Sequence, residues 1–145
     1  MNDLIVYLCN YAFDHGIGYE LNAQDFEPDD SPFSSTIESR VFINMNWINQ
    51  TEIPFQFAHE ISHILNGDSG SNNFAAPSLY SKEEYNANKR ATSILLEYCD
   101  LHGFQWKNVI DFMDSFSIPM RAKEAVKARF KEYVGVPYSV KACEI

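Results

Sequence analysis

The chain has 145 residues, of which 46% are hydrophobic and 21% are charged. This composition is ordinary for a globular protein, and the length fits a single domain over residues 1–145 but is hardly enough for two. The net charge is −9, and residues 1–80 carry eleven acidic side chains against one basic side chain. The acidic front half argues against direct binding of nucleic acid.

The cysteines and the N-terminal segment lead us to expect a cytoplasmic protein. Cys9, Cys99 and Cys143 are odd in number and far apart, and no C-x-x-C pair occurs. We therefore expect reduced thiols rather than a disulfide framework. The first residues, MNDLIVYLCNYAFDHG, have no early Lys or Arg, and Asn10 and Asp14 interrupt their apolar stretch. Neither a secretory signal nor a membrane-spanning helix is expected there.

The N-terminal part of the chain predicts one helix and a small sheet. Apolar residues recur at helical spacing over residues 2–15, and alternation of apolar and other residues predicts a short strand over residues 16–21. Residues 22–36 hold prolines among acidic residues and are predicted to be loop. Residues 37–45 alternate again, which predicts a second strand that is antiparallel to the first or lies in the same small sheet.

Helices are expected after the second strand. Residues 46–51 form a turn, and apolar residues then recur at helical spacing until Asn66-Gly67 supplies a stop. Residues 68–80 are predicted to be loop. Three further helices follow, over residues 81–100, about 104–116 and 119–134, the last ended by Gly135 and Pro137. The predicted fold class is therefore α+β, with a small N-terminal sheet followed by helices.

The segment FAHEISHIL, residues 57–65, contains the pattern H-E-x-x-H. His59 and His63 are four residues apart, so on a helix both imidazoles can point toward one position. Zinc binds imidazole nitrogens at about 2.0–2.1 Å. Glu60 would lie beside such a metal, where it can act as the general base for a zinc-bound water in peptide hydrolysis. The alternative is an ordinary helix with two histidines and no metal.

A catalytic zinc needs a third protein ligand. The metzincin extension of the motif requires Gly at position 66 and His at position 69. This chain has Asn66 and Ser69 there, which excludes that class. We therefore expect a Glu from the following helix, where Glu83 and Glu84 stand near the predicted start.

Spacing favours Glu84 over Glu83 as the third ligand. Three, seven and eleven residues after Glu84 come small and apolar residues that suit packing against the first helix, namely Ala87, Ala91 and Leu95. The same spacing from Glu83 gives a more mixed face. A further alternative is that neither binds metal, because Ser81 to Glu84 also fit a capping box, in which Glu84 would reach back to the Ser81 amide.

Residues 37–98 resemble the ImmA/IrrE family of metallopeptidases. ESRVFINMNW followed by IPFQFAHEISHIL resembles the family's short strand and its helix of the form rFtlAHElgHll. The next helix resembles the family pattern E-x-E-A-N-x-F-A-x-x-L-L-M-P at Glu84, Ala87, Asn88, Ala91 and the leucines. The chain departs from this pattern at Asn86, Arg90 and Glu97-Tyr98, and Asn86 leaves Glu84 as the acidic match.

The resemblance implies a zincin-like fold in which His59, His63 and Glu84 bind Zn²⁺ and Glu60 is catalytic. It also implies a cytoplasmic zinc endopeptidase that cleaves a helix-turn-helix transcriptional repressor and so derepresses phage or mobile-element genes. The second hypothesis is a non-catalytic, zinc-containing antirepressor that binds the repressor without cutting it. The repressor would be a separate partner protein, because we find no helix-turn-helix pattern in this chain.

Other residues are weaker site candidates. Asp68 either orients a zinc-bound imidazole or belongs to a polar loop. The basic residues between positions 121 and 131 are expected to form a solvated helix face, with docking of an acidic partner as the alternative. Zincins often stabilise the oxyanion with Tyr or His. Four residues are candidates by proximity, although packing or surface roles are expected for each: Tyr80, Tyr85, Tyr98 and His102.

Overall fold

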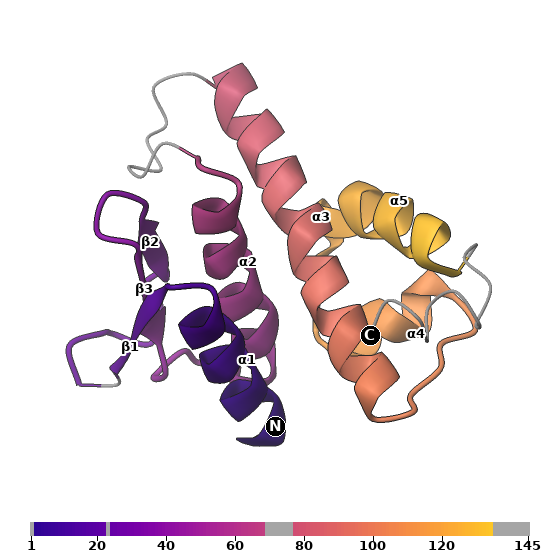
Figure 1. The fold of residues 1–145 in the computed structure, drawn as a ribbon, viewed down its shortest axis with the longest axis horizontal. Coiled ribbons are helices and arrows are strands. Elements are labelled where there is room, and N and C mark those ends of the chain that lie inside the picture. The colour runs from indigo at the N-terminus through magenta and orange to yellow at the C-terminus, as the bar shows by residue number, and fades with distance from the viewer. Residues whose placement is uncertain (1, 23, 69–76, 135–145) are drawn as a thin grey trace.

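The computed structural model describes residues 2–22, 24–68 and 77–134. These residues form an α+β fold, as predicted, in which helices pack beside a small three-stranded sheet (Figure 1). The strands are β1 (Gly18–Asn22), β2 (Phe33–Ser35) and β3 (Arg40–Asn44). The helices are α1 (Asn2–Asp14), α2 (Ile53–Leu65), α3 (Pro77–Leu101), α4 (Val109–Ser115) and α5 (Lys123–Val134), with short 3-10 helices η1 (Gln50–Glu52) and η2 (Met120–Ala122).

The sheet has the strand order β1-β3-β2. β1 and β3 are the two predicted strands, and they share one sheet but run parallel, with Glu20 opposite Phe42. The antiparallel alternative for this pair is therefore wrong. The antiparallel partner of β3 is β2, which lies inside residues 22–36. The prediction that this whole segment is loop is therefore wrong. Three residues between Pro32 and a turn are too few to show an alternating pattern.

Helix α2 lies between the sheet and α3 (Figure 1). The alternate residues Val41 and Ile43 of β3 are fully buried on the side of the sheet that contacts α2. A helix with apolar residues on nearly every side is a buried helix, and α2 buries Ile53, Pro54, Phe55, Phe57, Ala58 and Ile61. Its polar residues Glu60, Ser62 and His63 are buried with them, so they need partners inside the protein.

The predicted stop at Asn66-Gly67 ends α2 as a Schellman turn. Gly67 has a φ of +71° and donates its N–H to the carbonyl of Ile64 at 3.0 Å. Asp68 donates its N–H to the carbonyl of His63, also at 3.0 Å. This bond pattern satisfies the last carbonyls of the helix, and it brings Asp68 back over the last turn of α2.

Helix α3 begins at Pro77 rather than at Ser81. Ser81 is therefore inside the helix and cannot be its N-cap, so the capping-box alternative for Glu84 is wrong. Ala87 and Ala91 have no exposed surface, and their small side chains allow the close contact between α2 and α3. The helix ends at Leu101, and Gly103 follows with a φ of +73°, close to the predicted stop.

The last two helices differ in extent from their predictions. α4 starts at Val109 because Asn108 caps it, with its side-chain oxygen accepting the N–H of Asp111 at 2.9 Å. The predicted helix over residues 104–116 was therefore too long. The predicted helix over 119–134 is divided into η2 and α5, and its expected end at Gly135 and Pro137 lies outside the described residues. Within those residues, none of the helices has the length and apolar character needed to cross a bilayer.

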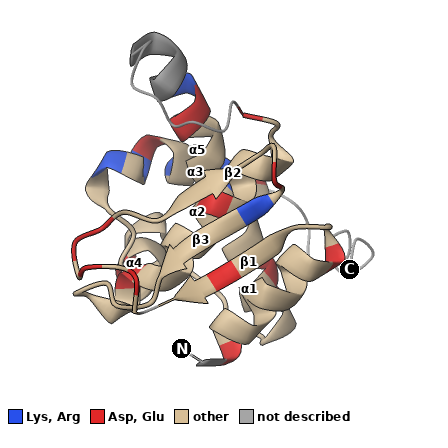
Figure 2. Ribbon diagram, turned by 90° about the vertical axis from the view of Figure 1, so that its left-hand side faces the viewer, with Lys and Arg blue, Asp and Glu red and all other residues tan. Residues whose placement is uncertain are grey.

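The acidic loop before β2 is held by Asn44 of β3. The Asn44 side chain is fully buried and donates to the carbonyls of Glu27 at 2.8 Å and Asp30 at 2.9 Å. Its carbonyl oxygen accepts the N–H of Asn46 at 2.8 Å. Figure 2 shows acidic residues of this loop in red beside the sheet. One buried amide thus fixes the backbone of a segment whose charged side chains face solvent.

Replacing Asn44 should therefore destabilise the fold. Asn44→Ala leaves two loop carbonyls without their donor, and we expect the free energy of unfolding in urea to fall by roughly 2–4 kcal/mol. The control is Asn46→Ala, because the exposed Asn46 side chain makes a single bond to the Phe26 carbonyl at 3.1 Å. That change should cost less than about 1 kcal/mol. Equal losses in the two variants would contradict this role of Asn44.

Candidate metal centre

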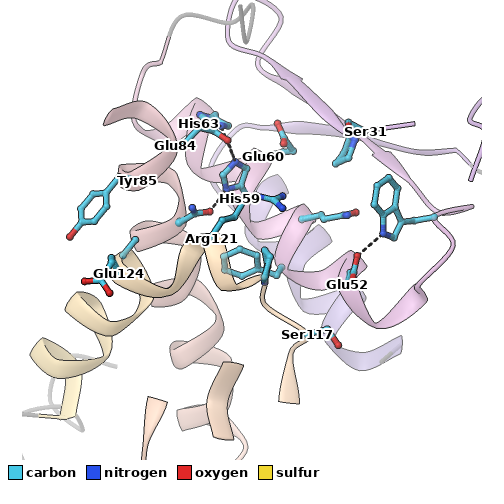
Figure 3. Close-up of a pocket in the computed structure, with 17 residues that line it drawn as sticks. Ser31, Glu52, His59, Glu60, His63, Glu84, Tyr85, Ser117, Arg121 and Glu124 are labelled. Atoms are coloured by element: carbon cyan, nitrogen blue, oxygen red, sulfur yellow. Dashed lines mark hydrogen bonds and ion pairs between the residues drawn. The ribbon is translucent and has the colours of Figure 1, made fainter. Parts of the chain in front are cut away.

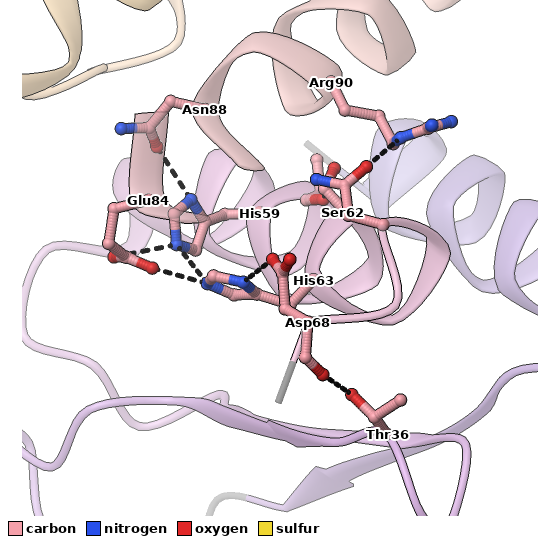
Figure 4. Close-up of polar contacts among 10 residues, drawn as sticks. Thr36, His59, Ser62, His63, Asp68, Glu84, Asn88 and Arg90 are labelled. Atoms are coloured by element: carbon pink, nitrogen blue, oxygen red, sulfur yellow. Dashed lines mark hydrogen bonds and ion pairs between the residues drawn. The ribbon is translucent and has the colours of Figure 1, made fainter. Parts of the chain in front are cut away.

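Helix α2 presents both histidines of the motif on one face (Figure 4). His59 Nε2 and His63 Nε2 are 3.1 Å apart, and the two rings are perpendicular. Two nitrogens that share a tetrahedral zinc at 2.0–2.1 Å lie about 3.3 Å from each other. The observed spacing is therefore close to that of two ligands of one ion, as the four-residue separation predicted.

Helix α3 brings a carboxylate to the same point. Glu84 Oε1 is 3.3 Å from His59 Nε2, and Glu84 Oε2 is 2.6 Å from His63 Nε2 (Figure 4). The structure thus brings together the three residues predicted as ligands. Glu83 lies next to Glu84 on α3, but the carboxylate that contacts both imidazoles belongs to Glu84.

His59, Glu60 and His63 are close enough to bind a metal ion. Each offers a ligand atom, and these atoms lie within 4.8 Å of one another. With Glu84, two imidazoles and two carboxylates meet at one place. Imidazole nitrogen and carboxylate oxygen are donors that zinc and several other divalent metals accept, so the donor set fits a divalent cation.

Each imidazole is oriented by a second polar residue. His59 Nδ1 is 2.7 Å from Asn88 Oδ1, and His63 Nδ1 is 2.8 Å from Asp68 Oδ2. When Nδ1–H donates to an oxygen, Nε2 keeps its lone pair for a metal, and the ring cannot rotate easily. Both rings are therefore fixed with Nε2 toward the cluster.

The Schellman turn after α2 places Asp68 beside His63. The Asp68 carbonyl also accepts a hydrogen bond of 2.6 Å from the Thr36 hydroxyl, which lies in the turn between β2 and β3. Asp68 was expected either to orient an imidazole or to belong to a polar loop, and its carboxylate does contact the His63 imidazole. The contact of Asn88 with His59 was not predicted from the spacing. Asn88 follows Glu84 by four residues, so its place on the same helix face was the available signal.

Glu60 is buried beside the imidazoles, with 6% of its surface exposed. Burial raises the pKa of its carboxyl, and the charges of His59 and His63 and a hydrogen bond with Ser34 oppose this rise. Its Oε1 is buried and has no hydrogen-bond partner among the described residues. A carboxylate with a raised pKa and an unused oxygen is suited to accepting a proton.

The carboxylates give the cluster a negative field. Burial lowers the pKa of His63, but the hydrogen bond to Glu84, the charge of Glu60 and the hydrogen bond to Asp68 outweigh burial and raise it to about 9. Burial raises the pKa of the Glu84 carboxyl, but the hydrogen bonds to His59 and His63 outweigh burial and hold that pKa far below its usual range. The site therefore favours positive charge, as a proton or as a metal ion.

A cleft of about 580 Å³ opens onto the cluster (Figure 3). His59, Glu60, His63 and Glu84 are part of its lining. Its other walls come from the loops that precede β2 and follow β3, and from the segment between α4 and α5. Volumes of this size are typical of ligand sites, so the cluster is accessible to a molecule much larger than water.

The four oxyanion candidates fall in different places. Tyr85 lines the cleft and is 40% exposed. Tyr98 is buried against Tyr7, with ring centroids 5.3 Å apart, and His102 packs on Tyr98 and donates from Nδ1 to its carbonyl at 3.0 Å. These two residues have packing roles. The side chain of Tyr80 lies outside the described residues.

The basic residues between positions 121 and 131 differ in their surroundings. Lys127 and Lys131 are exposed, as expected for a solvated face. Arg129 instead contacts Ser93 at 2.5 Å and pairs with Glu132 at 3.0 Å, so it joins α5 to α3. Arg121 lines the cleft. The expectation of one solvated face therefore holds for part of the run.

Comparison with protein-family models, curated proteins and solved structures finds no match to this chain. The site itself consists of a pair of oriented imidazoles and two carboxylates that line a cleft.

Removing an orienting residue should weaken metal binding. Asp68→Ala frees the His63 ring, and Asn88→Ala frees the His59 ring, so we expect each to reduce the affinity for a divalent metal, with Zn²⁺ as the probe, by about 10- to 100-fold. Competition with a chromophoric chelator measures this change. Asp14→Ala, at the end of α1, is the control and should leave the affinity unchanged. Unchanged affinity in the Asp68 and Asn88 variants would mean that the rings are held by other contacts.

Proposed function

We propose that the chain is a zinc-dependent endopeptidase with a zincin-like fold. The observation that carries this proposal is the contact of Glu84 with both Nε2 atoms, at 3.3 and 2.6 Å, beside the buried and partly unpaired Glu60. In this proposal the two carboxylates have different roles, Glu84 as a ligand and Glu60 as a base. A cleft at the same place offers room for a polypeptide.

In this proposal His59, His63 and Glu84 hold the zinc. Two imidazoles and one carboxylate leave a fourth coordination position open, which is the pattern of catalytic rather than structural zinc sites. Bound zinc supplies Lewis acidity that polarises the scissile carbonyl and makes the attacking water more acidic. Asn88 and Asp68 keep the imidazoles aimed throughout.

Glu60 moves the proton. Its carboxylate takes a proton from the attacking water as the new bond to the carbonyl carbon forms. It then gives this proton to the leaving amine as the C–N bond breaks, so the products are a carboxylate and an amine. The raised pKa of Glu60 brings it closer to the pH at which both transfers are efficient.

The substrate we propose is a helix-turn-helix transcriptional repressor in the cytoplasm. This step rests on the resemblance of residues 37–98 to the ImmA/IrrE family. Cleavage would derepress genes of a phage or mobile element. The alternative is a zinc-containing antirepressor that acts by binding. Glu60 favours cleavage, because a protein that only binds has no use for a buried base.

The test of cleavage is Glu60→Gln. This change keeps size and polarity but removes the base, so we expect about one bound zinc per chain and a 10²- to 10⁴-fold slower cleavage of a repressor encoded beside the gene. Metal analysis and gel-based cleavage assays measure the two quantities. A variant that still induces the repressed genes fully would instead support the antirepressor function.

The test of the ligand set compares neighbouring acids. Glu84→Ala should lower Zn²⁺ affinity by at least about 100-fold, because one of three protein ligands is lost. Glu83→Ala is the matched control and should bind zinc as the wild type does. The reverse result would assign the ligand to Glu83. If the wild-type protein contains no zinc and binds none on titration, both the protease hypothesis and the hypothesis of a zinc-containing antirepressor are contradicted.

A further inference from the structure

Gln56 is a polar residue of the cleft that the proposed chemistry does not use. Its Oε1 atom is buried and has no hydrogen-bond partner among the described residues, and Gln56 lines the cleft. A buried acceptor left unpaired is unfavourable, and buried polar groups in folded proteins nearly always have a partner. Gln56 is only partly buried, and rotation of its terminal amide turns Oε1 toward the cleft, where a bound molecule can supply that partner.

The neighbouring polar residues of α2 and η1 already have theirs. Glu52 accepts from Trp47 Nε1 at 2.8 Å and from Asn49 Nδ2 at 3.1 Å. The imidazoles of His59 and His63 are bonded as described above. Glu60 Oε1 shares the unpaired state of Gln56 Oε1, and the role of Glu60 as a base accounts for it. Gln56 is therefore the cleft residue of this helix whose unpaired atom still needs an explanation.

The position of Gln56 relates it to the reacting centre. It precedes His59 by three residues and Glu60 by four, so it lies on the same face of α2, about 6 Å along the helix axis. Two residues of an extended polypeptide span about 6.6 Å. Consider an extended substrate that runs along α2 with its reacting carbonyl beside Glu60. The main chain of the residue two positions from that carbonyl then lies beside Gln56.

We propose that Gln56 binds the main chain of the substrate, with Oε1 accepting a hydrogen bond from the N–H of a residue two positions from the scissile bond. The inference rests on the proposed function and deepens it. It defines the substrate as an extended chain that continues for at least two residues on one side of the bond. Proline lacks the N–H, so the position at Gln56 rejects proline and tolerates other residues.

The test uses hydroxamates, which bind zinc directly and need no catalysis. Acetohydroxamate occupies the metal alone, whereas two longer probes carry three alanines on the amino side or, as a succinyl hydroxamate, on the carboxyl side. Titration calorimetry with the zinc-loaded full chain measures each affinity. Gln56→Met has a similar length but lacks the acceptor. It should weaken one of the two peptidyl probes by roughly 3- to 10-fold and leave acetohydroxamate unchanged.

Methylation of a single amide identifies the hydrogen bond. N-methyl-alanine at the residue two positions from the zinc-binding group should reduce the affinity of wild-type protein by the same factor. It should cause no further loss in Gln56→Met, because the bond is already absent. Equal losses in the two proteins would overturn the proposed contact.

Thermal stability separates a ligand contact from a structural one. Gln56→Met removes an unpaired buried acceptor, so the Tm of the free protein should rise by about 2–5 °C. The matched control is Gln50→Met, because Gln50 donates to the carbonyls of Met45 at 3.1 Å and Trp47 at 2.7 Å. That variant should have a lower Tm and unchanged affinity for every probe.

The outcomes distinguish this inference from the proposed function. A lower Tm for Gln56→Met with unchanged probe affinities would overturn the inference, since Gln56 would then be bonded within the free protein. A zinc-loaded chain that binds no peptidyl probe more tightly than acetohydroxamate would also overturn it. If probe affinity depends on Gln56 but no repressor is cleaved, the inference about Gln56 is supported and the protease function is contradicted.

Discussion

The close contact of α2 with α3 is the interaction on which the site depends. The imidazoles belong to α2 and the carboxylate that meets them belongs to α3, so neither helix forms the cluster alone. Ala87 and Ala91 make this contact possible because they add almost no bulk between the helices. A larger side chain at either position would separate Glu84 from the two Nε2 atoms. The sheet on the other side of α2 completes the burial of most of the motif.

Burial of this polar cluster is tolerated because nearly every group in it has a partner. Asp68 and Asn88 bond the outer nitrogens of the rings, and Glu84 contacts the inner ones. The carboxylates raise the pKa of His63 to about 9, which shows how strongly the site attracts positive charge. The same attraction would serve a proton or a divalent ion, so binding of a metal by His63 would be coupled to release of its proton. Among the described residues that line the cleft, Glu60 Oε1 and Gln56 Oε1 are the buried side-chain atoms without a hydrogen-bond partner.

Local sequence patterns predicted the parts of the site that lie on regular helices. The spacing of His59 and His63 fixed their common face, and the alanines after Glu84 identified the side of α3 that packs on α2. Asn66-Gly67 predicted the end of α2. The strand pairing of the sheet could not be predicted from local patterns, because tertiary contacts decide which strand pairs with which. β2 has only three residues, and the parallel pairing of β1 with β3 depends on how the chain returns from the end of β1 to the start of β3. The contact of Asn88 with His59 likewise depends on the distance between two helices, which no single helix pattern contains.

The two helices that bring His63 and Glu84 together are consecutive in the chain, with a connecting segment between Leu65 and Pro77. In the proposed function, an ion held by His63 and Glu84 would close a loop of about twenty residues, much as a disulfide would. It would therefore restrict the unfolded chain and also resist separation of α2 from α3 in the folded state. Because the entropy of loop closure changes only slowly with loop length, the connecting segment can gain or lose residues at little energetic cost. Diversity in length is thus expected between His63 and Glu84 rather than within the helices that carry them.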